Sequence, residues 1–165
     1  MSEEIVKMPI LGKAEYDQLI QEEYVARIAF KGEKYPYIAP FLYFFDGDHM
    51  YFISTRYGKK IEYFMQNPYV SVEVEKYRHD LSDYAFVTLS GRLVEMKESD
   101  NKKKIRDSFV RMIKDKDLSK NIMIALGYSS QDPTEVLVRE ERNIIWKLTD
   151  VMKITGLKNR TTTEE

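Results

Sequence analysis

The chain has 165 residues, of which 43% are hydrophobic and 13% aromatic, enough for one domain with a buried core. Its 26 Lys and Arg against 27 Asp and Glu leave a formal charge of -1, which argues against a protein built to coat nucleic acid. The absence of cysteine excludes disulfides, thiolate nucleophiles, iron–sulfur clusters and cysteine-ligated zinc.

The lack of a membrane span and of a signal peptide in the sequence indicates the cellular compartment. No apolar stretch approaches the roughly 18 residues that span a bilayer, and the opening MSEEIVKMPI is acidic where a signal peptide is basic. We therefore expect a cytoplasmic protein with no membrane and no nucleic-acid partner. We predict one domain over residues 1–158 and a flexible C-terminal tail over 159–165.

In chain order, a helix comes first and strands follow. Residues 12–23 place Tyr16, Leu19 and Ile20 at helical spacing. After them come alternating or continuous apolar runs that are separated by short turns such as GEK and DGD. The predicted strands are 24–30, 35–45, 49–54, 69–77, 84–96, 134–140 and 143–155, the last two as a hairpin-like pair.

Two of these strands carry special residues. Pro36 and Pro40 cannot donate ladder hydrogen bonds, so we expect the second strand to lie at an edge or to carry a bulge. The strand 84–96 is expected to bend at Gly91.

Three more helices are predicted between and after the strands. One begins near Gly58 and stops at the Asn-Pro pair 67–68. A longer one follows Ser99, and a short one lies around 121–126. Strands that follow one another through short turns cannot be parallel, so the order predicts a mainly antiparallel barrel with helices attached.

Candidates for chemistry are few. His49 and His79 are the only histidines, and neither has metal-ligand spacing, so no metal site is predicted. A serine hydrolase is not expected either, because the chain has no GxSxG elbow. The shortage of side chains suited to catalysis favours a binding module, or an enzyme whose cofactor carries the reaction.

The run STRYGKK, residues 54–60, combines groups that suit an anion. If a strand ends near Ser54 and a helix begins near Gly58, free backbone N–H groups lie beside hydroxyls, a guanidinium and two ammonium groups. A phosphate would satisfy them and offset the placement of lysines at the positive end of the helix dipole. The alternative is a junction whose lysines are simply solvated, at a cost of a few tenths of a kcal/mol.

The order of features around this run is distinctive. A proline-containing strand, an Asp-Gly turn, a strand ending in a hydroxyl, a basic pair and an Asn-Pro stop follow one another over residues 24–75. Together with VTLSGRLVEM and KLTDVMKITGLK, this succession resembles the FMN-binding split-barrel family related to pyridoxamine 5'-phosphate oxidase, in its flavin-nucleotide-binding or nitroimidazole-reductase-like branch. The resemblance extends from the first helix to about Lys158.

The resemblance implies an α+β fold, mainly β: an antiparallel split β-barrel of six to seven strands with two to four short helices. It also implies a homodimer with FMN at the subunit interface. Lys59 and Lys60 would hold the FMN phosphate together with Ser54, Thr55 and Arg56. Beside the isoalloxazine would lie Ile53 and a strand that contacts the ring mainly through its backbone, namely Ile38, Ala39, Pro40, Phe41 and Leu42.

Departures from the family shape the functional expectation. The chain closes on WKLTDVMKITGLKNRTTTEE, where the genuine oxidase has a Trp/Arg/Leu/Pro-type ending, so we do not expect vitamin B6 oxidation. Ile53 stands where the nitroimidazole-reductase-like branch often has a histidine, and neither His49 nor Arg92 is assigned a role at the cofactor. The prediction is an oxidoreductase that passes hydride from a reduced nicotinamide through FMN to a small acceptor. The alternatives are a flavin storage or sensing module without turnover, and a barrel that binds a deazaflavin or haem.

Overall fold

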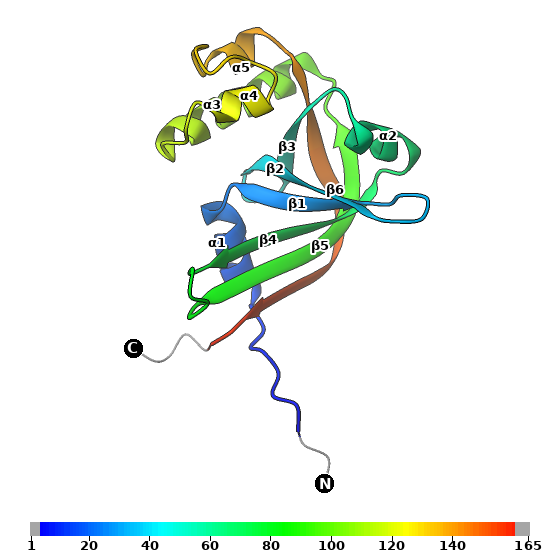
Figure 1. Cartoon of the computed structure of the whole chain (residues 1–165), viewed down its shortest axis with the longest axis vertical. Coiled ribbons are helices and arrows are strands. Elements are labelled where there is room, and N and C mark those ends of the chain that lie inside the picture. The colour runs from blue at the N-terminus through cyan, green and yellow to red at the C-terminus, as the bar shows by residue number, and fades with distance from the viewer. Residues whose placement is uncertain (1–3, 161–165) are drawn as a thin grey trace.

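Six strands close into an antiparallel barrel in the computed structural model of the chain, which describes residues 4–160 (Figure 1). The order around the barrel is β1-β2-β3-β6-β5-β4. The bounds of the strands are β1 (Val25–Phe30), β2 (Tyr37–Phe45), β3 (Met50–Thr55), β4 (Tyr69–Tyr77), β5 (Tyr84–Glu95) and β6 (Asn143–Lys158). The predicted antiparallel split-barrel fold is confirmed.

Residue alternation places the barrel core. In β4, Val70, Val72 and Val74 are buried while Tyr69 and Ser71 face outward, as a period of two requires. Aromatic side chains from other strands and from the helix after β3 complete this core. The ring of Trp146 is fully buried, and its contacts, at centroid distances between 5.0 and 5.9 Å, are with Phe30, Phe41 and Phe64.

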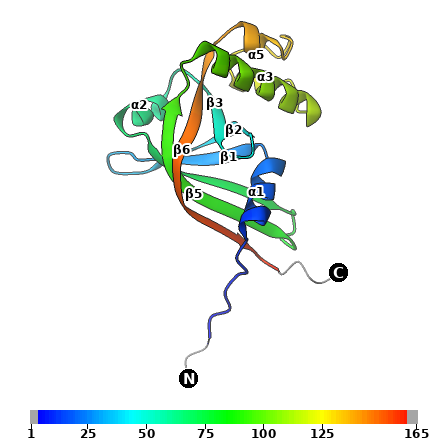
Figure 2. The same ribbon diagram turned by 180° about the vertical axis from the view of Figure 1, so that it is seen from behind.

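Five helices surround the barrel within the described residues: α1 (Lys13–Glu22), α2 (Lys59–Gln66), α3 (Ser99–Asp115), α4 (Ile122–Ala125) and α5 (Val136–Arg139). The last three gather at one end of the barrel, whereas α1 lies against β4 and β5 (Figures 1 and 2). A second apolar cluster joins α3 to the strands, and Leu42, Ile53 and Ile145 pack in it with Phe109 of the helix.

One predicted strand is wrong. Residues 134–140 contain α5 in place of a strand, which is why the helices exceed the predicted two to four by one. An apolar run of three residues, Val136–Val138, cannot be assigned to helix or strand by periodicity alone. Here Val136 and Leu137 are buried, and β6 pairs with β3 and β5.

The predicted bend at Gly91 coincides with irregular pairing between β5 and β6. The register shifts on both sides of Ser90, between Thr88 and Arg92. A Cβ atom at Gly91 would lie 2.8 Å from the carbonyl oxygen of Thr149, so this close approach requires glycine.

Asn159, the first residue of the predicted tail, is hydrogen-bonded to the segment that connects β4 and β5 and to the start of β5. Its side-chain amide donates to the carbonyl oxygens of Leu81 (3.3 Å) and Ser82 (3.1 Å), and its Oδ1 accepts from the N–H of Tyr84 (3.1 Å). Residues 161–165 of that prediction lie outside the described residues. Between residues 4 and 160, no helix has the length and apolar character needed to cross a membrane.

Candidate functional site

The helix α2 begins directly after a turn that only glycine adopts easily. Gly58 has φ +99° and is the N-cap of the helix, so the basic pair occupies the first two helical positions. No side chain caps this terminus. The first N–H groups of α2 therefore have no side-chain acceptor, which is the backbone half of an anion-binding site.

Lys60 lies half-buried beside this terminus. Its Nζ donates to the Oγ1 of Thr55 at 2.8 Å and stands 5.7 Å from the centroid of the Phe41 ring. Burial lowers the pKa of the Lys60 ammonium from its ordinary value. Among residues 4–160 no carboxylate forms an ion pair with Lys60 or with the exposed Lys59. A partly desolvated cation without a counter-ion favours an external anion.

The two hydroxyl groups at the end of β3 have different hydrogen-bond partners. Ser54 is buried, and its Oγ donates to the carbonyl oxygen of Thr55 at 2.9 Å. Thr55 is also buried, but its Oγ1 already faces the Lys60 ammonium. The structure therefore joins Thr55 and Lys60 directly, while Ser54 supports the strand end.

β2 lies between β1 and β3 in the barrel, and the edge character predicted for this strand is limited to its first half. Only Tyr43–Phe45 of β2 pairs with β3, so the preceding half of the strand is bonded to β1 alone. The N–H of Tyr43 donates to Tyr24, and bonding alternates along an antiparallel pair. The backbone groups of Ile38, Pro40 and Leu42 therefore face the open edge, where a planar ligand could accept or donate hydrogen bonds.

The side chains of the predicted ring-binding residues point in different directions. Ile38 and Pro40 are exposed, Ala39 and Phe41 pack toward the barrel core, and Leu42 lies in the cluster under α3. Ile53 is buried in the same cluster under α3. A ligand at this edge would meet mainly backbone and the exposed Ile38 and Pro40.

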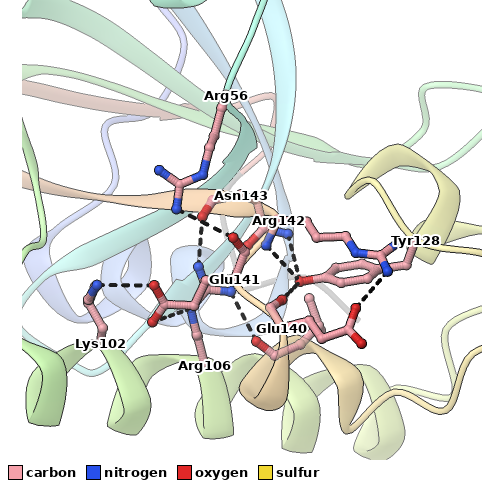
Figure 3. Close-up of polar contacts among 9 residues, drawn as sticks. Arg56, Lys102, Arg106, Tyr128, Glu140, Glu141, Arg142 and Asn143 are labelled. Atoms are coloured by element: carbon pink, nitrogen blue, oxygen red, sulfur yellow. Dashed lines mark hydrogen bonds and ion pairs between the residues drawn. The ribbon is translucent and has the colours of Figure 1, made fainter.

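Arg56 belongs to a polar cluster that includes Glu141. Its Nη2 lies 3.4 Å from the carbonyl oxygen of Glu141 (Figure 3). The remaining residues considered at the outset lie elsewhere. Arg92 forms an exposed ion pair with Asp150 at 3.1 Å, and His79 is exposed. No group of metal-binding side chains gathers within the described residues.

The polar cluster of Figure 3 is the feature that the sequence analysis missed. Arg106 on α3 is buried and donates to Asn143 at Oδ1 (2.6 Å) and at the backbone oxygen (2.8 Å), and to the backbone oxygen of Leu137 (3.0 Å). Asn143 in turn pairs with Thr55 across β3 and β6. The sequence did contain a signal for this cluster, because Arg106 is a charged residue within the apolar stripe formed by Ile105 and Phe109.

The family model described as Pyridoxamine 5'-phosphate oxidase matches residues 12–140. No curated protein sequence matches the chain.

Solved structures share the fold. An FAD-binding protein from Mesorhizobium loti is 20% identical with a TM-score of 0.70, over 94% of this chain and 100% of that one. A putative 5-nitroimidazole antibiotic resistance protein from Bacteroides thetaiotaomicron is 18% identical with a TM-score of 0.57, over 98% and 99%. The haem storage protein HutZ from Vibrio cholerae is 10% identical with a TM-score of 0.65, over 88% and 94%.

These structures establish the fold, which therefore includes proteins named for FAD binding and for haem storage. The family match covers more than half of the chain and contains both α2 and the open edge of β2. This chain belongs to the pyridoxamine 5'-phosphate oxidase family.

Proposed function

We propose that the protein is a cytoplasmic flavoprotein that binds FMN and acts as an oxidoreductase toward a small acceptor. The observation that carries the proposal is the half-buried Lys60 ammonium, which has no carboxylate partner in the described residues and lies beside the uncapped start of α2. A phosphate at this position would receive a charge-assisted bond from Lys60 and backbone bonds from the helix. The open edge of β2 adds an extended wall next to it.

The residues of the chain bind and orient the cofactor in this proposal. Lys59 and Lys60 would hold the phosphate, with the Thr55 hydroxyl positioning the Lys60 ammonium. The backbone groups of Ile38, Pro40 and Leu42 would meet the polar edge of the ring, and Pro40 can offer only its carbonyl. FMN, when bound, supplies hydride transfer between a reduced nicotinamide and an acceptor.

The absorption spectrum of the protein as isolated, and after reconstitution with FMN, tests the cofactor. We expect a bound yellow chromophore that is released as FMN on denaturation. Release of FAD, a deazaflavin or haem would contradict the proposal. With FMN bound, oxidation of a reduced nicotinamide in the presence of an electron acceptor tests the activity, and its absence with every donor would assign the protein to flavin storage.

The affinity for FMN is expected to depend on pH in two limbs. It should rise as the phosphate becomes dianionic near pH 6. It should fall again at alkaline pH as Lys60 loses its proton, and because burial lowers the pKa of Lys60, this loss begins below the titration range of an ordinary lysine. Binding titrations across the pH range check this, and Lys60→Ala should lose the alkaline limb.

We also propose that the protein is a homodimer whose interface is the outer face of the barrel. One row of outward positions runs across five strands, Ile38, Ala29, Ser71, Ser90 and Met152. The middle residues of this row, Ala29, Ser71 and Ser90, are small and form the floor of a groove of about 700 Å³. Ile38 and Met152, at the two ends of the row, are 63% and 56% exposed. A groove flanked by exposed apolar side chains suits a self-complementary contact between two copies.

Met152→Glu tests this interface. A buried, unpaired carboxylate would be created in each copy, so we expect the dimer to dissociate into monomers. Sedimentation or light scattering measures the mass. Ile124→Glu, which replaces an equally exposed residue on α4 far from the groove, should leave the dimer intact. A wild-type monomer would refute the proposal.

A further inference from the structure

The buried guanidinium of Arg106 has an N–H group without an acceptor. The residue is 1% exposed, and its two terminal nitrogens make three hydrogen bonds, to Asn143 and Leu137. Its Nε makes no hydrogen bond within the described residues, and the nearest anionic atom, Oε1 of Glu141, is 3.9 Å away. A charged donor removed from water is costly to leave unsatisfied.

This guanidinium lines a small cavity, which we call the Arg106 pocket. Its volume is about 130 Å³, the space of roughly four waters at about 30 Å³ each. The residues around it are Arg56, Glu95, Met96, Lys97, Lys102, Arg106, Glu141, Asn143, Ile144 and Ile145. Four of these carry positive charge and two carry negative charge, so the lining has an excess of two positive charges.

Glu141 is the only lining carboxylate that approaches these cations closely in the described structure. Its Oε2 pairs with Lys102 at 3.1 Å (Figure 3), and its side chain is 40% exposed. It satisfies Arg106 poorly, because 3.9 Å is too long for a hydrogen bond. Arg56 reaches the backbone oxygen of Glu141, at 3.4 Å, and no carboxylate. The Glu141 carboxylate therefore pairs with Lys102, lies only 3.9 Å from the buried Arg106, and forms no ion pair with Arg56 within the described residues.

We propose that the Arg106 pocket binds a small oxyanion, the carboxylate or phosphate group of a metabolite, at a site distinct from the Lys59–Lys60 pair. The free Nε–H of Arg106, the Lys102 ammonium and the Arg56 guanidinium supply donors from three directions. Lys60 lies with α2, whereas Arg106 lies on α3 beyond Asn143, the β6 partner of Thr55. The proposal does not depend on the identity of the cofactor.

The experiment follows the Arg106 Nε–H resonance by ¹H–¹⁵N NMR during titration with inorganic phosphate, and separately with acetate, at constant ionic strength set with chloride. The Lys59→Ala/Lys60→Ala protein is used so that the other anion site is disabled. We expect the resonance to shift and saturate. A lower half-saturation with phosphate would identify a phosphate site, and one with acetate a carboxylate site.

Two pairs of variants test how the charges of Glu141 and Lys102 change the affinity of the Arg106 pocket for the anion. Glu141→Gln removes the competing carboxylate and should tighten binding at least about fivefold. Glu140→Gln makes the same charge change at a side chain that pairs with Arg142, and should have little effect. Lys102→Gln should weaken binding at least about fivefold, whereas Lys103→Gln, an exposed neighbour that does not line the pocket, should not. An Nε–H resonance that neither anion moves, or equal effects within each pair, would overturn the proposal.

Discussion

Replacing Lys59 and Lys60 together by alanine is expected to weaken FMN binding by about 100-fold to 1,000-fold. Each charge-assisted bond to a phosphate contributes about 1.5–3 kcal/mol, and each 1.4 kcal/mol corresponds to a tenfold change in affinity. Most of the loss should come from Lys60, because its ammonium is partly desolvated and held by Thr55, whereas Lys59 is exposed. Titration of the buried Trp146 fluorescence, or of flavin fluorescence, measures the dissociation constant.

A matched variant controls for the loss of two charges. Lys103→Ala/Lys104→Ala removes two exposed lysines from α3 and should change the affinity little. If both double variants bind FMN like the wild-type protein, Lys59 and Lys60 are solvated surface lysines, and the proposed phosphate site is incorrect. If they weaken binding equally, the effect is one of net charge.

Replacing Arg106 by methionine is expected to lower the free energy of unfolding by about 3–5 kcal/mol, because three bonds to a charged group of about 1.5–3 kcal/mol each are lost and removal of the buried charge offsets part of that loss. Methionine keeps much of the volume of the side chain but donates no hydrogen bond. The Oδ1 and the backbone oxygen of Asn143 and the backbone oxygen of Leu137 would then each lose a charged donor inside the protein. Urea denaturation followed by circular dichroism measures the change.

The control for this prediction is on the same helix. Arg111 is exposed, and its one side-chain hydrogen bond within residues 4–160 is a long contact with Ser108 at 3.5 Å, so Arg111→Met should change stability by no more than about 0.5 kcal/mol. A double-mutant cycle adds a second test. Arg106→Met and Asn143→Leu remove the same side-chain bond, so their effects should be less than additive. Full additivity, or equal effects at Arg106 and Arg111, would show that the network does not stabilise the junction of α3 and β6.

Much of the fold could be predicted because its signals are local. The alternation in β4, the Asp-Gly turn before β3 and the Asn-Pro stop after α2 each specify structure within a few residues. The strand predicted over residues 134–140 was wrong because this region contains a short apolar run, which a helix and a strand would bury equally well. The packing of α5 against α3 distinguishes the helix from the strand.

The candidate site, like the fold, could be predicted from the sequence only in part. The meeting of a strand that ends in hydroxyls, a glycine and two lysines at the start of α2 could be predicted from the sequence, because these residues are neighbours in the chain. The packing of distant segments, in contrast, buries half of Lys60 against Phe41, brings Arg56 to Glu141 and leaves the first half of β2 without a partner in β3. It also buries Arg106 against Asn143, 37 residues away along the chain. Burial and strand pairing are set by segments distant in sequence, so no local pattern specifies which charge remains without a partner.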